Sequence, residues 1–381
     1  MSDPRPTLEH RVTPLELFLD LVFAFAFTQV TTLLSDEPTW AGLGHGLLVL
    51  STLWLAWTAY AWLTNTVDPE EGAALGTMLI AIAAMFFAAL AVPEAFGRYG
   101  VLFGVALLVA RAMALILLAV AVRGERSSTR TIFRSAPFGL GSAALILGAG
   151  FVDGWPRSLM WLIAVVIGLL GPLFGKPIGW HLQPAHFVER YGLIIIIAIG
   201  ESLIAIGLGA RKVGLGPAVM LSAALGLAVA ASFWLAYFDF FPLRIRQLLL
   251  DRSGRERTAV ARDVFTYLHL PLVVGIILFA FAMKTMLADV WARPDALLAL
   301  CLCGGPALYL SAYVGVRLRV AGTPGRGRFT ACLLCAGLIP VATVVPTVAA
   351  LAMVAAVWVC LHAYELVWWR EERAQVRALR A

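Results

Sequence analysis

The sequence predicts an all-α membrane protein of about twelve transmembrane helices, and three observations lead to this fold class. First, the 381 residues are 61% hydrophobic and only 14% charged, whereas a soluble domain is about half apolar and about a quarter charged. Second, apolar runs of about 20 residues, long enough to span a bilayer as helices, recur from end to end. Third, most of the basic residues fall in the loops on one side of the membrane that these runs would cross. A water-soluble globule could not bury this much apolar surface.

Charged residues, Pro and Gly close the apolar runs and place twelve spans along the chain. The last two are divided at Pro346, because the stretch 329–369 carries Glu365 as its only charge. As one helix rising about 1.5 Å per residue, that stretch would be about twice as long as the bilayer core. The predicted spans lie near 15–34, 43–63, 73–93, 99–122, 136–152, 158–175, 187–209, 216–239, 264–286, 295–316, 329–345 and 348–369.

The distribution of Lys and Arg predicts the orientation, since these residues concentrate in cytoplasmic loops. With the N-terminus in the cytoplasm, 22 of the 29 basic residues lie on the cytoplasmic side, five lie opposite, and Arg111 and Lys284 lie inside spans. We therefore expect a single membrane domain over 1–381 with both termini in the cytoplasm and a basic tail at 371–381. Anionic lipid head groups are the expected partners of this face. The basic residues form no continuous stripe, which argues against a nucleic-acid partner.

A weak internal repeat relates span 1 to span 7. LELFLDLVFAFAFTQV in span 1 aligns with VERYGLIIIIAIGESL in span 7, which places Glu16 on Glu189 and Thr28 on Glu201. WLAW in span 2 also resembles WLAY in span 8. Two matches this short arise either from a duplication or by chance. A duplication would give two parallel halves of six helices each, with the chain dividing into 1–180 and 181–370.

Four blocks of the chain resemble the bacterial low temperature requirement A proteins. They are VTPLELFLDLVFAFAFTQVT (12–31), ERYGLIIIIAIGESLIAIG (189–207), FWLAYFD (233–239) and ARDVFTYLHLPLVVGIIL (261–278). The resemblance implies a multi-pass protein of the bacterial inner membrane, in a family named for a role in growth in the cold. It supplies no substrate.

Ionisable residues inside the spans are the candidate functional groups, because each costs about 2.5–3.5 kcal/mol to insert. Glu16 and Asp20 are four residues apart on one helical face, an arrangement that suits a proton or cation site. The alternative for Glu16 is a carboxylate at the membrane interface near the helix N-terminus. Glu201 lies near the bilayer midplane, and Arg111 lies at a similar depth in span 4. We expect these two to pair, either as a structural tie or as a gate.

A second group of candidates lies at the cytoplasmic ends of spans 7 to 9. Tyr267 and His269 precede Pro271, which frees a backbone carbonyl, and histidine can change charge near physiological pH. The alternative for His269 is a buried histidine hydrogen-bonded to a carbonyl. Three further carboxylates are expected to form interfacial ion pairs with nearby arginines. These secondary candidates are Glu189, Asp239 and Asp263, with Arg190, Arg244 and Arg262 as partners.

Other residue patterns favour structural roles. The aromatic residues Trp54, Trp57 and Tyr60 are expected mainly to contact lipid and anchor the interfaces. Gly192, Gly200 and Gly207 are expected to form a thin helix face that another helix approaches. The paired cysteines at 301, 303, 332 and 335 fall inside apolar spans without polar neighbours and are expected to be small apolar fillers. We expect no metal and no cofactor, and no nucleotide loop or catalytic motif identifies an enzyme.

Two functional hypotheses follow from these patterns. The first is a secondary transporter in which Glu16, Asp20 and Glu201 exchange a proton or cation during transport of a small solute or ion. The second is a non-transporting protein that handles lipid or acts as a scaffold in cold adaptation. A transport path needs connected polar groups from one side of the membrane to the other, whereas a scaffold needs only isolated ties.

Overall fold

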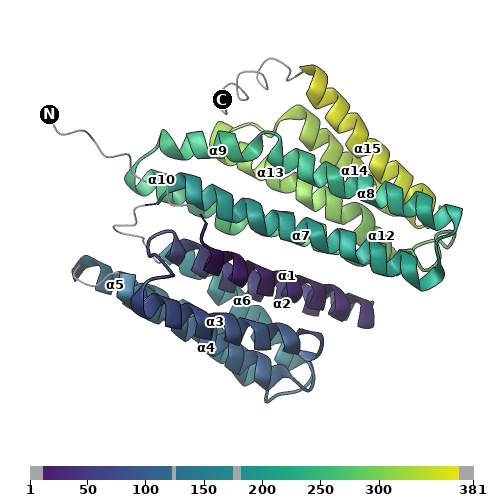
Figure 1. Ribbon diagram of the computed structural model, residues 1–381. Helices are drawn as coiled ribbons and strands as arrows, with labels where there is room; N and C mark the ends of the chain where they lie inside the picture. The colour runs from purple at the N-terminus through teal and green to yellow at the C-terminus, as the bar shows by residue number, and fades with distance from the viewer. Residues whose placement is uncertain (1–11, 122–125, 175–181, 369–381) are drawn as a thin grey trace.

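The computed structural model describes residues 12–121, 126–174 and 182–368, and the regular structure in this part of the chain is entirely helical (Figure 1). The tail predicted at 371–381 lies outside these residues. The elements are α1 (Pro14–Asp36), α2 (Trp40–Thr64), α3 (Gly72–Ala91), η1 (Val92–Glu94), α4 (Gly100–Ala121), α5 (Arg126–Ala149), α6 (Trp155–Phe174), α7 (Pro184–Val213), α8 (Pro217–Phe238), α9 (Phe241–Leu250), α10 (Gly254–Ala261), η2 (Arg262–Leu268), α11 (His269–Met286), α12 (Ala296–Ala299), η3 (Leu300–Gly304), α13 (Gly305–Ala321), α14 (Arg326–Ala342) and α15 (Thr347–Trp368).

Ten helical segments of the described residues are long and apolar enough to cross a membrane. They make the chain a multi-pass membrane protein in contact with the bilayer. The other two predicted spans coincide with shorter helices: the apolar part of α5, Ala136–Ala149, and the 17-residue α14. Each of the twelve predicted spans thus lies on a helix. The predicted division at Pro346 is confirmed, because α14 ends at Ala342 and α15 begins at Thr347.

The helices pack in two groups of the same pattern. In the first group, α1 packs on α2 and α3, α3 on α4, α4 on α5, α5 on α6, and α6 on α2. In the second group, α7 packs on α8 and α11, α11 on α13, α13 on α14, α14 on α15, and α15 on α8. The two groups meet where α1 contacts α7 and α11, with α2 also touching both (Figure 1). Helices α1 and α7 are therefore central to the molecule.

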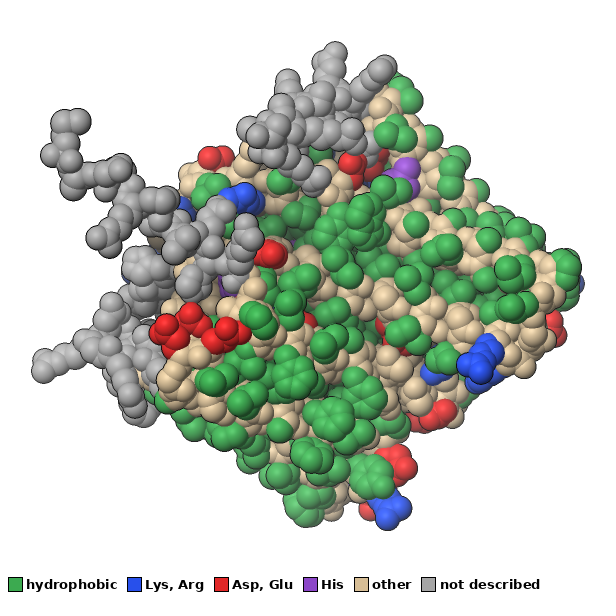
Figure 2. Space-filling view, in the orientation of Figure 1, with side chains coloured by type: hydrophobic (Ala, Val, Ile, Leu, Met, Phe, Trp, Pro, Cys, Tyr) green, Lys and Arg blue, Asp and Glu red, His purple; other side chains and the backbone are tan. Residues whose placement is uncertain are grey.

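Aromatic side chains fill much of the core, which corrects one prediction. Trp54, Trp57 and Tyr60 on α2 are at most 1% exposed, so they pack inside the protein and do not contact lipid. These side chains can be buried because their polar atoms have hydrogen-bond partners. The Trp54 indole donates to the carbonyl of Thr266, and the Tyr60 hydroxyl donates to the carbonyl of Ala110. Figure 2 shows hydrophobic side chains over the middle of the visible face and most of the visible charged ones toward the ends of the helices.

The predicted thin face of α7 is present at one of its three glycines, since a Cβ atom added at Gly192 would lie 3.4 Å from the Phe238 ring of α8. A Cβ atom added at Gly200 or Gly207 would meet nothing within 4 Å, so the predicted thin face of α7 is wrong at these two positions. Helices α11 and α13 approach each other closely at Gly275 and Gly305. A Cβ at Gly275 would lie 2.5 Å from the Gly305 carbonyl oxygen, and one at Gly305 would lie 2.7 Å from the Gly275 carbonyl oxygen.

Candidate functional site: a buried charge network between α1 and α7

The first turn of α1 positions Glu16. Thr13 caps the helix by accepting a hydrogen bond from the Glu16 N–H, while Glu16 Oε2 accepts one from the Thr13 N–H at 2.9 Å. This capping box explains why a carboxylate is stable here. The side chain is nevertheless fully buried. Glu16 therefore lies at the N-terminus of α1, as the alternative interpretation expected. It is also a charged group buried inside the protein.

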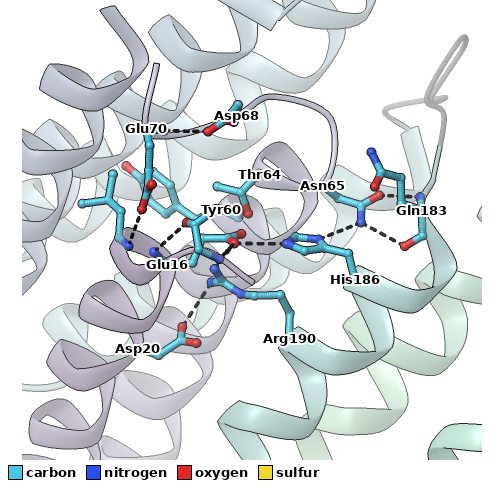
Figure 3. Close-up of polar contacts among 12 residues, drawn as sticks. Glu16, Asp20, Tyr60, Thr64, Asn65, Asp68, Glu70, Gln183, His186 and Arg190 are labelled. Carbon is cyan, nitrogen blue, oxygen red and sulfur yellow. Dashed lines mark hydrogen bonds and ion pairs between the residues drawn. The ribbon is translucent and has the colours of Figure 1, made fainter. Parts of the chain in front are cut away.

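Arg190 of α7 joins Glu16 to Asp20 (Figure 3). Its Nη1 lies 2.8 Å from Glu16 Oε1, and its Nη2 donates to Asp20 Oδ1 at 3.1 Å. The indole of Trp57 also donates to Asp20 Oδ1, at 2.8 Å, and the Arg190 guanidinium lies over its ring. All these side chains are at most 1% exposed. The expected interfacial pair between Glu189 and Arg190 is not formed, because Arg190 faces α1, is completely buried and pairs with Glu16 and Asp20.

His186 completes the network, and its neighbours fix its protonation. The Asn65 side chain is clamped to the backbone of Gln183, whose N–H donates to Asn65 Oδ1 and whose carbonyl accepts from Asn65 Nδ2 (Figure 3). The second Nδ2 hydrogen then points at His186 Nδ1, 3.1 Å away. Nδ1 must therefore be the bare, accepting nitrogen, and the proton lies on Nε2, which donates to Glu16 Oε2 at 3.0 Å. In this tautomer both ring nitrogens of His186 have a hydrogen-bond partner.

The network therefore carries an unbalanced charge. With His186 in the tautomer that Asn65 selects, Glu16 and Asp20 contribute two negative charges, Arg190 contributes one positive charge, and His186 contributes none. Asp20 Oδ2 is buried and has no hydrogen-bond partner among the described residues. A buried charge without compensation is strongly unfavourable. The site is thus suited to take up one proton or one monovalent cation, and Asp20 Oδ2 is the oxygen open to it.

Glu201 forms a second polar site farther along the same helix pair. It is 3% exposed, and its two carboxylate oxygens accept from the hydroxyls of Thr28 and Thr31, each at 2.5 Å. The predicted ion pair with Arg111 is wrong. Depth in the membrane can be read from sequence, but rotation about the helix axis cannot. On α4, Arg111 interacts with the Tyr60 hydroxyl instead.

The cation that acts on Glu201 is Lys284 of α11. Its ammonium donates to Thr32 Oγ1 at 3.2 Å, and its electrostatic neighbours also include Asp36 and Lys212, near the ends of α1 and α7. Polar side chains therefore lie at two levels of α1: Glu16 and Asp20 are near its start, and Thr28, Thr31, Thr32 and Asp36 are in its second half. The apolar residues 21–27 separate the two levels.

His269 and Tyr267 flank this pair of helices without joining the charge network. His269 is fully buried, and its Nδ1 donates to the Val264 carbonyl at 2.9 Å while Nε2 lies 3.0 Å from the Tyr237 hydroxyl. His269 is therefore a buried histidine hydrogen-bonded to a carbonyl, which is the alternative that the sequence left open. Tyr267 donates to the Leu169 carbonyl of α6 at 2.7 Å. Both residues belong to the region where a π-helical turn, η2, leads into α11.

The secondary candidates separate into different roles. Asp263 forms the predicted pair with Arg262, at 2.6 Å, and a second pair with Arg319 at 2.8 Å. Glu189 is exposed, so it forms no pair with the inward-facing Arg190. Asp239 lies at the C-terminal end of α8. None of the three belongs to the buried network.

Sequence reasoning missed Asn65, the two threonines as ligands of Glu201, and the role of Lys284. The sequence did contain a signal, since Lys284 is one of only two basic residues inside spans and Thr28 aligns with Glu201 in the internal repeat. No group of three or more His, Cys, Asp or Glu side chains in the described part of the chain has the spacing of a metal site.

Comparison with known proteins finds similarity to bacterial proteins. The family model described as "Bacterial low temperature requirement A protein (LtrA)" matches residues 11–363. An uncharacterized protein of Rhizobium meliloti (strain 1021) is 30% identical over 320 residues, which cover 78% of this chain and 74% of that protein. No solved structure matches the chain.

Proposed function

The chain belongs to the bacterial low temperature requirement A protein family, and we propose that it is a secondary transporter coupled to a proton or a monovalent cation. The coupling site is the buried network of Glu16, Asp20, Arg190 and His186 between α1 and α7. The transported partner is a small solute or ion.

The uncompensated charge of this network carries the proposal. A structural tie needs equal charges, because an unpaired buried charge destabilises the protein by several kcal/mol, on the order of 3–5. Here two carboxylates share one guanidinium, and Asn65 prevents His186 from supplying the second positive charge without breaking a hydrogen bond. Reversible binding of a proton or cation at Asp20 would restore the balance.

The polar groups along α1 also support transport over scaffolding. Glu201, its two threonines and Lys284 form a second polar level on the same helix pair, beyond the apolar residues 21–27. The Thr28 and Thr31 hydroxyls each have a second acceptor, the Ala24 carbonyl at 3.3 Å and the Thr28 carbonyl at 2.9 Å. A protonated Glu201 could therefore donate to one hydroxyl, which would turn to its backbone acceptor. The site can satisfy both protonation states without rearranging the helices.

The proposal includes twelve spans in two parallel halves, 1–180 and 181–370. The matching order of helix contacts in the two groups supports this duplication. A second observation is that Thr28 and Glu201, which align in the repeat, touch each other. Equivalent residues of two related halves meet only close to the axis that relates them. On this view α1 and α7 flank the axis, where alternating motion of the halves would open and close the site.

We further propose a location in the bacterial cytoplasmic membrane with both termini in the cytoplasm. The excess of Lys and Arg on one side supports this orientation, in which Glu16 and Asp20 lie toward the cytoplasm and Lys284 toward the outside. Interaction with anionic lipid head groups would occur on the cytoplasmic face.

Flux measurements in proteoliposomes test the proposal. Purified protein is reconstituted with a pH-sensitive dye or a cation-sensitive dye inside, and gradients of protons, Na⁺, K⁺ and a panel of small solutes are imposed. We expect flux in the wild type and its loss in Asp20→Asn, which keeps the shape of the side chain but removes its charge. Glu189→Gln is the matched control, because Glu189 is an exposed carboxylate one residue from Arg190, and it should leave flux unchanged.

Two outcomes would contradict the proposal. One is the absence of any flux from a wild type that is folded and inserted in one orientation. The other is equal flux in the wild type and Asp20→Asn. Either result would make the network a structural element and favour the alternative of lipid handling or scaffolding.

A further inference from the structure

A cavity of about 590 Å³ lies away from the α1–α7 contact, between α9, α13, α14 and α15. Its lining combines apolar side chains, such as Phe241, Ile245 and Val316, with four arginines. The arginines come from three different helices and are Arg244, Arg317, Arg326 and Arg328. Asp251 and Glu365 are the two carboxylates of the lining, so the described lining has an excess of two positive charges.

Local packing holds two of these arginines in place. Arg328 Nε donates to Glu365 at 2.8 Å, and its guanidinium lies 4.3 Å from the centre of the Tyr313 ring. Glu365 is thereby neutralised. Arg317 packs directly over Gly325, where a Cβ atom would lie only 2.7 Å from Arg317 Cδ. Gly325 also has a φ of 75°, a left-handed conformation that favours glycine.

The N-terminus of α14 adds backbone donors to the cavity. The 17-residue helix begins at Arg326, its cap residue Gly325 supplies no side-chain acceptor, and its first turn contains no acidic residue. The first N–H groups of a helix lack intrahelical acceptors and carry partial positive charge. Arginines and helix-terminal N–H groups together form the usual environment of a bound phosphate.

We propose that this cavity binds the phosphate ester of an anionic ligand. The apolar half of the lining favours the headgroup region of an anionic phospholipid over a free organic phosphate. The cavity lies beside the ends of α13 and α15, on the side where the basic loops predict the cytoplasm, and anionic lipids attract basic residues there. This site is separate from the coupling site; the choice of an anionic lipid rests on the orientation proposed above, but not on the transport proposal.

Lipid binding to purified full-length protein in detergent tests the site. Native mass spectrometry measures the apparent Kd for phosphatidylglycerol, with phosphatidylcholine as the neutral lipid and glycerol 3-phosphate as the soluble phosphate ester. We expect the double variant Arg317→Gln/Arg326→Gln to bind phosphatidylglycerol about 25-fold more weakly, from roughly fivefold per arginine. Gly325→Ala keeps every charge but displaces Arg317, so it should also weaken binding. Arg255→Gln, an exposed arginine outside the cavity, should have no effect.

The outcomes distinguish a phospholipid ligand, a soluble phosphate ester and non-specific attraction to surface charge. Preference for phosphatidylglycerol with this pattern of variants supports a phospholipid. Equally tight binding of glycerol 3-phosphate, with the same pattern, supports the phosphate site with a soluble ester as its ligand. Equal binding of the two lipids and none of glycerol 3-phosphate would overturn the proposal. So would an Arg255→Gln variant as weak as the double variant, since the effect would then be general surface charge.

Discussion

At the residue scale, Glu16 and Asp20 are one helical turn apart but have different surroundings. Glu16 is compensated by Arg190, His186 and the Thr13 N–H. Asp20 shares Arg190, and one of its oxygens has no described partner. The excess negative charge therefore belongs mainly to Asp20, and substitutions there distinguish a structural role from a functional one.

Removing the charge of Asp20 should not destabilise the protein. Asp20→Asn keeps Oδ1 as an acceptor for Trp57 and Arg190 and removes the uncompensated charge. We expect the free energy of unfolding to be unchanged or raised, on the order of 1 kcal/mol, since an unpaired buried charge is unfavourable. Arg190→Met should instead lower it by about 3–5 kcal/mol. Thermal unfolding in detergent measures both. Strong destabilisation by Asp20→Asn would identify the network as a balanced structural tie.

The two buried histidines should have opposite tautomers. Asn65 makes His186 carry its proton on Nε2, whereas the Val264 carbonyl makes His269 carry its proton on Nδ1. ¹⁵N NMR of histidine-labelled protein at neutral pH distinguishes the two neutral forms, and His186→Gln and His269→Gln variants assign the signals. A doubly protonated His186 would show that the compensating proton lies on this ring and not on Asp20.

At the element scale, helix positions follow from sequence much better than helix contacts do. Each predicted span lies on a helix because apolar length is a local property. Which side chains meet depends on how each helix is rotated about its axis, and this is decided by packing over the whole molecule. Glu201 and Arg111 have similar depths, yet Glu201 faces α1 while Arg111 faces α2. The pair expected between Glu189 and Arg190 fails for the same reason, since Glu189 is exposed while Arg190 faces α1. Glu16 and Asp20 were identified because both lie on one helix, where spacing alone fixes a common face.

Glycine substitutions test these helix contacts. Gly275→Ala would place a methyl group against the Gly305 carbonyl, so α11 and α13 would have to separate. We expect a loss of about 1–3 kcal/mol in the free energy of unfolding. Gly200→Ala on α7 meets open space and should be neutral or slightly stabilising. Thermal unfolding of the two variants compares them directly. Equal effects would contradict the contact described between α11 and α13.

At the scale of the whole molecule, the two groups of helices and their meeting place connect fold to function. The charge network and the Glu201 site both lie where α1 of one group contacts α7 of the other. Residues from both groups must come together to form each site. Relative motion of the groups would therefore change both sites at once, as a coupled transporter requires. This account depends on α5 and α14 crossing the membrane, because only then do the groups have the same orientation.

Labelling of introduced cysteines decides whether α14 crosses. In a variant whose five native cysteines are replaced by alanine, Thr323→Cys and Val344→Cys place single thiols at exposed positions before and after α14. Asp251→Cys and Asp289→Cys are the references for the two sides, since they lie at opposite ends of the segment Gly254–Met286. A membrane-impermeant maleimide should label Thr323→Cys and Asp251→Cys in inside-out vesicles, and Val344→Cys and Asp289→Cys in right-side-out vesicles. Labelling of Thr323→Cys and Val344→Cys from the same side would mean that α14 does not cross. The two groups would then not be equivalent, and rocking of parallel halves could not be the transport mechanism.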